Sequence, residues 1–155
     1  MNNNITEDYV SFEVAKLLKE KGFGVPCNYY YREKEYVEAL NKNRESLGLS
    51  ERFEEGSVGE QLNKQHKGRL VNRNQYDTTT SRPTQALAIK WIRENFDIHL
   101  WIIPYDDNEL SQTLYEWKCI DKKDDWNDIE GYEYFHSSEE ATEAALLHTL
   151  KNLIP

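Results

Sequence analysis

Apolar and polar positions alternate along this chain with two periods, one typical of helices and one typical of strands. Near the N-terminus, apolar residues recur every three or four positions over 12–21, so that they share one helical face. Ser11 can cap the start of this helix, and Gly22 followed by Phe23 fits the left-handed turn that ends many helices. We therefore predict a capped helix over 12–21.

A short aromatic stretch and a long polar stretch follow. Residues 27–31 read Cys-Asn-Tyr-Tyr-Tyr and are compatible with a strand, and 34–47 has a helical pattern. From 50 to 80 the chain is polar, with three glycines, several Asn and Gln and a run of threonines, so little of it can enter a core. We predict an N-terminal helical extension over 1–49 and a polar loop or insertion over 50–80.

Regular patterning returns after this polar segment. Pro83 suits the first turn of a helix, and the apolar residues of 84–95 recur at helical spacing. The next run, 98–103, is apolar on both faces, which favours a central strand that ends at Pro104. We expect this helix and this strand to begin the main core.

A second strand is predicted over 113–120, because aromatic or cysteine side chains alternate there with aliphatic or charged ones. This alternation is typical of a sheet with one covered face. One face would carry Leu114, Glu116, Lys118 and Ile120, and the other would carry Tyr115, Trp117 and Cys119.

The C-terminal part is predicted to contain an acidic loop, a short strand and a final helix. The loop covers 121–130 and the strand covers 132–136. Ser137 and Glu140 form a capping box for a helix over 138–153. The residues of this last segment that we expect to point inward are Ala141, Ala144, Ala145, Leu147, Leu150 and Ile154.

Together these elements predict an α+β fold. The core over 81–155 has the order α-β-β-β-α, with a three-stranded antiparallel sheet packed by the helices 84–95 and 138–153. The N-terminal extension and the polar insertion precede this core. We expect one compact domain overall, because 155 residues suffice for a single core.

The order of elements from Arg82 to Ile154 resembles that of the double-stranded-RNA-binding domain, and the alanine-rich segment 140–147 resembles its closing helix. That family grips phosphates with a lysine cluster at the start of the last helix, where this chain reads Ser-Ser-Glu-Glu over 137–140. Its first hairpin loop carries a histidine, where 106–109 reads Asp-Asp-Asn-Glu. The resemblance implies the fold, and we expect double-stranded RNA not to be a partner.

Two segments are similar to small uncharacterised proteins encoded by phages and prophages of gut bacteria. They run from Tyr9 to Phe23, YVSFEVAKLLKEKGF, and from Arg82 to Glu94, RPTQALAIKWIRE. This resemblance implies a cytoplasmic accessory protein of a mobile element. It brings no activity that could be transferred to this chain.

Charge and composition narrow the choice of partners. The formal charge is −9, from 19 Lys and Arg against 28 Asp and Glu, of which −1 falls on 1–80 and −8 on 81–155. Such a protein repels phosphate backbones and anionic lipids. The N-terminus lacks the pattern of a signal peptide, no run is long and apolar enough for a membrane span, and Cys27 and Cys119 are expected to be reduced. We predict a cytoplasmic protein without a membrane partner.

No motif of known chemistry is present. The four histidines and two cysteines form neither CxxC nor HExxH, and GxSxG, GxGxxG and GxxxxGK[ST] are absent. We therefore predict no catalytic, cofactor-binding or metal-binding residues. An enzyme stays open as an alternative, because paired carboxylates that meet only in space leave no spacing to find in a sequence.

Aromatic residues, which make up 12% of the chain, crowd the predicted strands and their loops. Tyr and Trp are common anchors of protein interfaces, although strands also favour aromatic residues for packing alone. We hypothesise a non-enzymatic role in protein–protein interaction, through Tyr115, Trp117, Trp126, Tyr132 and Tyr134. The alternative is nucleic-acid binding by the basic segment that holds Lys64, Lys67, Arg69 and Arg73.

Overall fold

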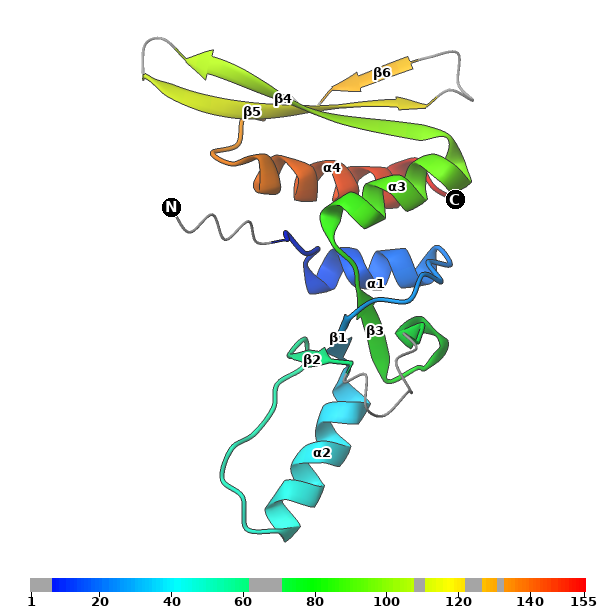
Figure 1. Cartoon of the computed structure of the whole chain (residues 1–155), viewed down its shortest axis with the longest axis vertical. Helices are drawn as coiled ribbons and strands as arrows, with labels where there is room; N and C mark the ends of the chain where they lie inside the picture. The colour runs from blue at the N-terminus through cyan, green and yellow to red at the C-terminus, as the bar shows by residue number, and fades with distance from the viewer. Residues whose placement is uncertain (1–6, 62–70, 108–110, 122–126, 131–132) are drawn as a thin grey trace. The chain divides into compact units, whose positions relative to one another are not determined.

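The computed structural model describes residues 7–61, 71–107, 111–121, 127–130 and 133–155. The chain forms two compact units (Figure 1). One unit is Ser11–Pro83, and the other combines Met1–Val10 with Thr84–Pro155. We call them the first unit and the second unit, and each contains helices and a three-stranded antiparallel sheet.

The first unit is built around a small sheet. Its elements in chain order are α1 (Phe12–Glu20), β1 (Tyr29–Arg32), α2 (Lys34–Ser46), β2 (Val58–Glu60), the 3-10 helix η1 (Arg73–Gln75) and β3 (Thr79–Arg82). The strand order is β2-β1-β3, and both pairs are antiparallel. Tyr30 lies at the centre of the sheet, opposite Gly59 on one side and Ser81 on the other.

The predicted ends of α1 are confirmed. The hydroxyl of Ser11 accepts a hydrogen bond from the backbone N–H of Val14 at 3.2 Å. Gly22 has a φ of 90°, and the N–H of Phe23 donates to the carbonyl of Leu18 at 2.9 Å. This is the Schellman geometry, which satisfies carbonyls that the last turn leaves without partners.

The polar segment 50–80 was predicted to be a loop, and the structure corrects this prediction. It contains β2 and the first half of β3, the two outer strands of the first sheet. Thr79, Thr80 and Ser81 are buried, because small hydroxyl side chains can enter a core when they find hydrogen-bond partners. The hydroxyl of Thr79, for example, donates to the carbonyl of Arg73 at 3.0 Å.

In the second unit, a helix precedes the strands and another follows them. The elements are α3 (Gln85–Phe96), β4 (Ile98–Asp107), β5 (Gln112–Asp121), β6 (Asn127–Glu130) and α4 (Ser138–Asn152). The strand order is β4-β5-β6, with antiparallel pairing throughout. Figure 1 shows α3 and α4 on the same side of this sheet. The predicted mixture of helices with a three-stranded antiparallel sheet is confirmed.

Two predictions about these strands were wrong. The strand that begins at Ile98 is an edge strand, and it continues through Pro104 to Asp107. An edge position tolerates proline, because the missing N–H can face away from the neighbouring strand. The third strand lies at 127–130, inside the predicted acidic loop. Within the predicted strand 132–136, Phe135 forms an isolated bridge with Tyr115.

The covered side of the second sheet carries the core of this unit. Ile98, Trp117 and Cys119 are buried, and α3 and α4 contribute buried apolar residues of their own. In the last segment, the predicted inward positions Ala141, Ala145, Leu150 and Ile154 are buried, whereas Ala144 and Leu147 are only half-buried and Leu146 is buried instead. Among the described residues, no helix is long and apolar enough to cross a membrane.

Candidate interaction surface

The two faces of the second sheet have different surroundings. Ile98, Leu100 and Ile102 of β4 pair with Asp121, Cys119 and Trp117 of β5, and these residues share the face that α4 covers. The ring of Trp117 lies 5.0 Å from that of His148 in α4. Because side chains alternate along a strand, the residues between them point to the other side.

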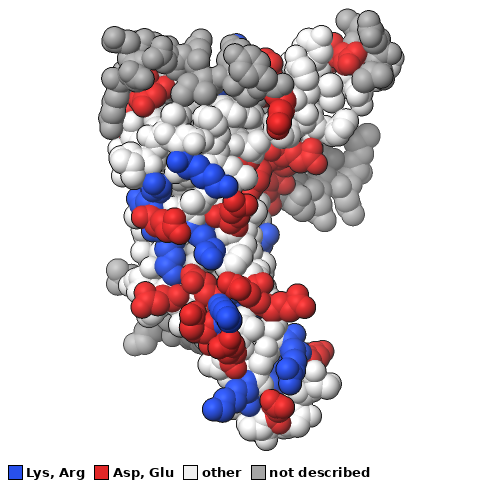
Figure 2. Space-filling view, turned by 180° about the vertical axis from the view of Figure 1, so that it is seen from behind, with Lys and Arg blue, Asp and Glu red and all other residues white. Residues whose placement is uncertain are grey.

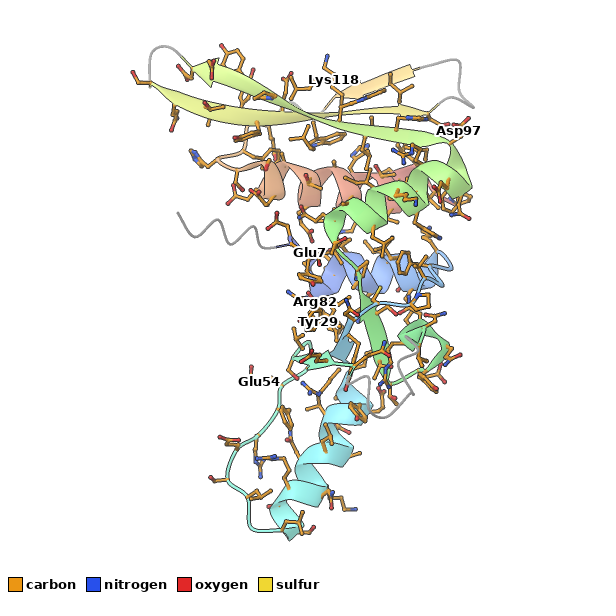
Figure 3. All side chains as sticks on the ribbon, viewed as in Figure 1. Glu7, Tyr29, Glu54, Arg82, Asp97 and Lys118 are labelled. Carbon is orange, nitrogen blue, oxygen red and sulfur yellow. The ribbon has the colours of Figure 1, made fainter. Side chains whose placement is uncertain are left out.

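We call this other side the open face. Among the described residues no helix or strand covers it, and Figure 3 shows Lys118 projecting from the sheet away from α3 and α4. Its members on the two long strands are His99, Trp101, Ile103, Tyr105, Leu114, Glu116, Lys118 and Ile120.

Three large aromatic side chains are exposed on or beside the open face. The exposed fractions are 45% for Trp101, 48% for Tyr105 and 55% for Tyr134. Tyr134 follows β6 and precedes Phe135, whose bridge with Tyr115 joins it to the sheet. Because Phe135 pairs with a residue of the covered face, its neighbour Tyr134 projects to the open side.

Tyr105 and Tyr134 approach one another across β5. Their ring centroids are 5.3 Å apart with an interplanar angle of 33°. Leu114 pairs with Tyr105 in the register, and it is only 9% exposed although it lies on the open face. The two rings therefore form an aromatic pair beside an apolar side chain that is itself nearly buried.

A second aromatic pair lies toward the beginning of β4. The rings of His99 and Trp101 are stacked, with centroids 5.9 Å apart. The Nε2 of His99 lies 3.5 Å from the Oδ1 of Asp97, the residue with positive φ that joins α3 to β4 (Figure 3). The open face thus has aromatic groups at two places, with Ile103, Glu116 and Lys118 between them.

The structure places the predicted interaction residues in different environments. Trp117 is 6% exposed and packs on α4, so its predicted role as a surface contact was wrong. Tyr115 is half-buried on the same covered face, and Tyr134 is exposed. Trp126 and Tyr132 lie outside the described residues.

Sequence reasoning missed Trp101 and Tyr105. The signal was present, because His99, Trp101, Ile103 and Tyr105 occupy alternate positions and therefore share one face of a strand. Both faces of this strand are apolar, and a strand that is apolar throughout is usually central. For this reason the sequence did not indicate that one of its faces would be exposed.

The two units differ sharply in charge. The second unit has six Lys and Arg against 17 Asp and Glu, a net charge of −11. The first unit has 13 basic against 11 acidic residues, a net charge of +2. The acidity predicted for the C-terminal half therefore belongs to the unit that carries the open face.

The basic segment proposed for nucleic acid is described only in part. Lys64, Lys67 and Arg69 lie outside the described residues. The guanidinium of Arg73 lies over the ring of Tyr30, with its carbon 4.5 Å from the ring centroid. In Figure 2, basic and acidic side chains are interspersed on the visible face, without the continuous basic patch that nucleic-acid binding favours.

A cavity of about 350 Å³ in the second unit bears on the enzymatic alternative. Glu7, Asp8 and Glu139 contribute carboxylates to its lining, beside Gln85 and Thr142. Hydrogen bonds from its own backbone N–H and from the hydroxyl of Ser138 lower the pKa of Glu139. This carboxyl therefore stays ionised near neutral pH and is a poor proton donor.

The two cysteine thiols are poor nucleophiles in the folded protein. Burial raises the pKa of the Cys27 thiol to about 12 and that of Cys119 to about 11. Such thiols are inert because the nucleophilic form is the thiolate. Within the described ranges, no three His, Cys, Asp or Glu side chains are grouped so that they could hold a metal ion.

Comparisons with known proteins give no family for this chain. No protein-family model, no curated protein and no solved structure matches it. The resemblances to the double-stranded-RNA-binding domain and to phage-encoded proteins therefore remain predictions from the sequence.

Proposed function

We propose that this chain is a non-enzymatic protein-binding module, and that the open face of the second sheet receives a basic protein partner. The observation that carries this proposal is the group of half-exposed aromatic side chains, Trp101, Tyr105 and Tyr134, on a sheet face that no described element covers. The role as an accessory protein of a phage or another mobile element belongs to the same proposal and rests on the sequence resemblance alone.

The chemistry of the face favours a protein as the ligand. Large exposed apolar groups that lie together on a surface commonly mark interaction sites, and Trp and Tyr dominate the energetics of such sites. Ile103 and Ile120 add aliphatic surface, and Glu116 and Lys118 add groups that can orient a partner. An exposed aromatic sheet face suits another protein surface better than it suits a small molecule, which needs a concave pocket.

The negative charge of the second unit favours a basic protein as the partner over a second copy of the chain. A second copy of the chain would bring a second charge of −11 against the first, and like charges disfavour such an association. Nucleic acid is disfavoured for the same reason. A partner with apolar side chains surrounded by Lys and Arg would fit both the aromatic groups and the acidic surroundings.

The edge of β4 that faces away from β5 is a less suitable docking site than the open face. Strand addition needs a row of backbone donors and acceptors, and Pro104 lacks the N–H that one position of this edge would supply. We therefore assign the interaction to side chains rather than to an added strand.

The test compares capture of proteins from bacterial lysate by the immobilised wild type, Trp101→Ala and Tyr105→Ala. Any captured protein is then purified and titrated against each form by calorimetry. We expect a basic protein whose affinity falls at least about tenfold in both variants, the usual effect of removing an aromatic anchor. Raising the salt concentration should also weaken binding, because the attraction is partly electrostatic.

Tyr76→Ala is the matched control, because Tyr76 is an exposed aromatic residue of the first unit, with an exposed fraction of 45%. This variant should bind like the wild type. Equal binding by Trp101→Ala and the wild type would rule out the open face as the site. A dimer in sedimentation that Trp101→Ala abolishes would identify a second copy as the occupant and overturn the assignment to a basic partner.

A further inference from the structure

One carboxylate of the open face lies among apolar and aromatic side chains without an ionic partner. Glu116 of β5 is half-buried, and it pairs with Ile103 of β4 in the register. Within the part of the chain that the structure describes, its carboxylate takes part in no ion pair and in no side-chain hydrogen bond. Asp97, by contrast, already has the ring of His99 as a partner.

Tyr134 stands next to Glu116 on the side of β5 that faces away from β4. The backbones of Tyr115 and Phe135 exchange two hydrogen bonds, each of 2.9 Å. In an antiparallel bridge, the residue before one partner stands opposite the residue after the other, so Tyr134 stands opposite Glu116. Side chains opposite one another in this way have Cβ atoms about 4.5 to 5.5 Å apart. Glu116 is therefore flanked by Ile103 on one side and by Tyr134 on the other.

Tyr105 approaches the same carboxylate from β4. It lies two residues beyond Ile103 on the open face and is thus a diagonal neighbour of Glu116. Diagonal neighbours in a sheet are about 7 to 8 Å apart, within reach of an aromatic side chain. The rings of Tyr105 and Tyr134 contact one another, and each side chain is still about half exposed. A cation that binds Glu116 can therefore also contact the exposed surface of this tyrosine pair.

Lys118 determines the side of Glu116 from which a cation would bind. It lies two positions further along β5 on the open face, opposite Trp101. Because two positive charges repel, a cation paired with Glu116 lies away from Lys118 and toward Tyr105 and Tyr134. The tyrosine pair, rather than Trp101, is then the aromatic group that the cation contacts.

From this geometry we infer that Glu116, Tyr105 and Tyr134 form a binding site for an arginine side chain of the basic partner, an inference that rests on the proposed function of the open face. A planar guanidinium can donate two parallel hydrogen bonds to a carboxylate and stack on an aromatic ring with the same group. The ammonium of lysine is a compact and more strongly hydrated charge, so it gains less from the rings. The site therefore distinguishes arginine from lysine.

The experiment measures binding of two capped tripeptides, acetyl-Gly-Arg-Gly-amide and acetyl-Gly-Lys-Gly-amide, to the full chain by two-dimensional NMR at constant ionic strength. Both peptides carry the same charge, so a difference in affinity reports the shape of the cation. We expect saturable shifts of the amide signals of Tyr105, Glu116 and Tyr134, with an affinity at least about threefold higher for the arginine peptide. Equal affinities, or no saturable shift at tens of millimolar peptide, would overturn the inference.

Two variants test the contributions of the charge and of the rings. Glu116→Gln should weaken binding of the arginine peptide at least about fivefold, because the guanidinium loses its carboxylate partner. Tyr134→Leu keeps an apolar side chain but removes a ring, so the preference for arginine over lysine should disappear. Circular dichroism establishes that each variant is folded, and Glu116→Thr replaces Glu116→Gln if the latter unfolds.

Glu94→Gln is the matched control, because it removes the same charge from the same unit at a different place. Glu94 belongs to α3, which covers the other side of the sheet (Figure 1). Its side chain is 58% exposed, and its Oε1 lies 3.8 Å from the Nζ of Lys90. This variant should bind the arginine peptide like the wild type. Equal weakening by Glu94→Gln and Glu116→Gln would show a response to net charge alone and would disprove the site.

The protein captured from lysate separates this inference from the proposed function. We expect both Trp101→Ala and Glu116→Gln to weaken its binding. Weaker binding by Trp101→Ala but not by Glu116→Gln would keep the open face as the docking surface and disprove the arginine site. Equal binding by Trp101→Ala and the wild type would instead remove the proposed function, and the peptide titrations would still test the arginine site by themselves.

Discussion

Trp101 of β4 and Trp117 of β5 lie on opposite faces of one antiparallel sheet. Trp101 is 45% exposed on the open face, whereas Trp117 is 6% exposed and packs against His148 of α4. In the register Trp101 pairs with Lys118, and Trp117 pairs with Ile102. These two pairs are neighbours along the strands, so their side chains point to opposite faces of the sheet.

Replacing these two tryptophans should have different effects on stability. Trp117→Ala leaves a cavity in the core of the second unit and should lower the free energy of unfolding by about 3 to 5 kcal/mol. Trp101→Ala removes a surface side chain and should change it by less than about 1 kcal/mol. Urea denaturation followed by circular dichroism measures both. A large loss in Trp101→Ala would mean that the open face is part of a packed core.

The ion pair between Lys19 and Glu33 should contribute to the stability of the first unit. The Nζ of Lys19 lies 2.7 Å from the Oε1 of Glu33 and donates to the carbonyls of Tyr76 and Thr79, both at 2.9 Å. The hydroxyl of Thr80 donates to the same carboxylate oxygen. Lys19→Met removes three hydrogen bonds and leaves a sheltered carboxylate without its cation, so we expect a loss of about 2 to 3 kcal/mol.

Lys34→Met provides the control for that measurement. Lys34 and Glu38 form a pair on the surface of α2 at 4.0 Å, and both side chains are about two-thirds exposed. Pairs of this kind contribute little, so this variant should change the free energy of unfolding by less than about 0.5 kcal/mol. Similar losses for the two lysines in chemical denaturation would contradict the special role of Lys19.

Gly59 should tolerate no side chain, because Tyr30 occupies the space where a Cβ would lie. Arg73 covers the ring and the sheet lies beneath it, so the ring cannot move away freely. Gly59→Ala should therefore destabilise the protein by about 1 to 3 kcal/mol. At Gly24 the nearest atom to an added Cβ would be 3.5 Å away, an ordinary contact. Gly24→Ala should be neutral or stabilising by about 0.5 kcal/mol in thermal denaturation.

The two cysteines should be nearly unreactive in the folded protein. Burial raises the pKa of Cys27 to about 12 and that of Cys119 to about 11, from an ordinary value of 9.0, and the nearby charge of Asp121 adds to the effect at Cys119. At pH 8 the thiolate fraction is then on the order of one in a thousand or less. Ellman's reagent should label both thiols at once in guanidinium chloride and only slowly in buffer. Rapid labelling in buffer would show that a thiol is accessible.

The same pKa values predict a dependence of stability on pH. Because the folded-state pKa of each thiol is raised, the unfolded chain loses its thiol protons first as the pH rises above about 9. The stabilisation is complete below that pH and is lost progressively up to about 11 or 12. Urea denaturation between pH 8 and 11 should therefore show a steeper decline for the wild type than for a Cys27→Ser/Cys119→Ser double variant.

The sequence by itself determined the local elements whose signals lie within a few residues. Ser11, Gly22 and Phe23 specify both ends of α1, because capping depends on neighbouring backbone groups. The alternation of Leu114 to Ile120 likewise specifies β5 and divides its side chains between two faces. The mixture of helices and antiparallel strands follows from such local patterns.

The tertiary structure alone decided which strands pair and which face stays open. Nothing in the local sequence around Gly59 or Ser81 shows that both residues will pair with Tyr30, because the partners are distant in sequence. Alternation separates Trp117 from Lys118 but does not say which side α4 will cover. That choice depends on packing between elements far apart along the chain, and for this reason the exposed aromatic residues proved to be Trp101 and Tyr105 rather than Trp117.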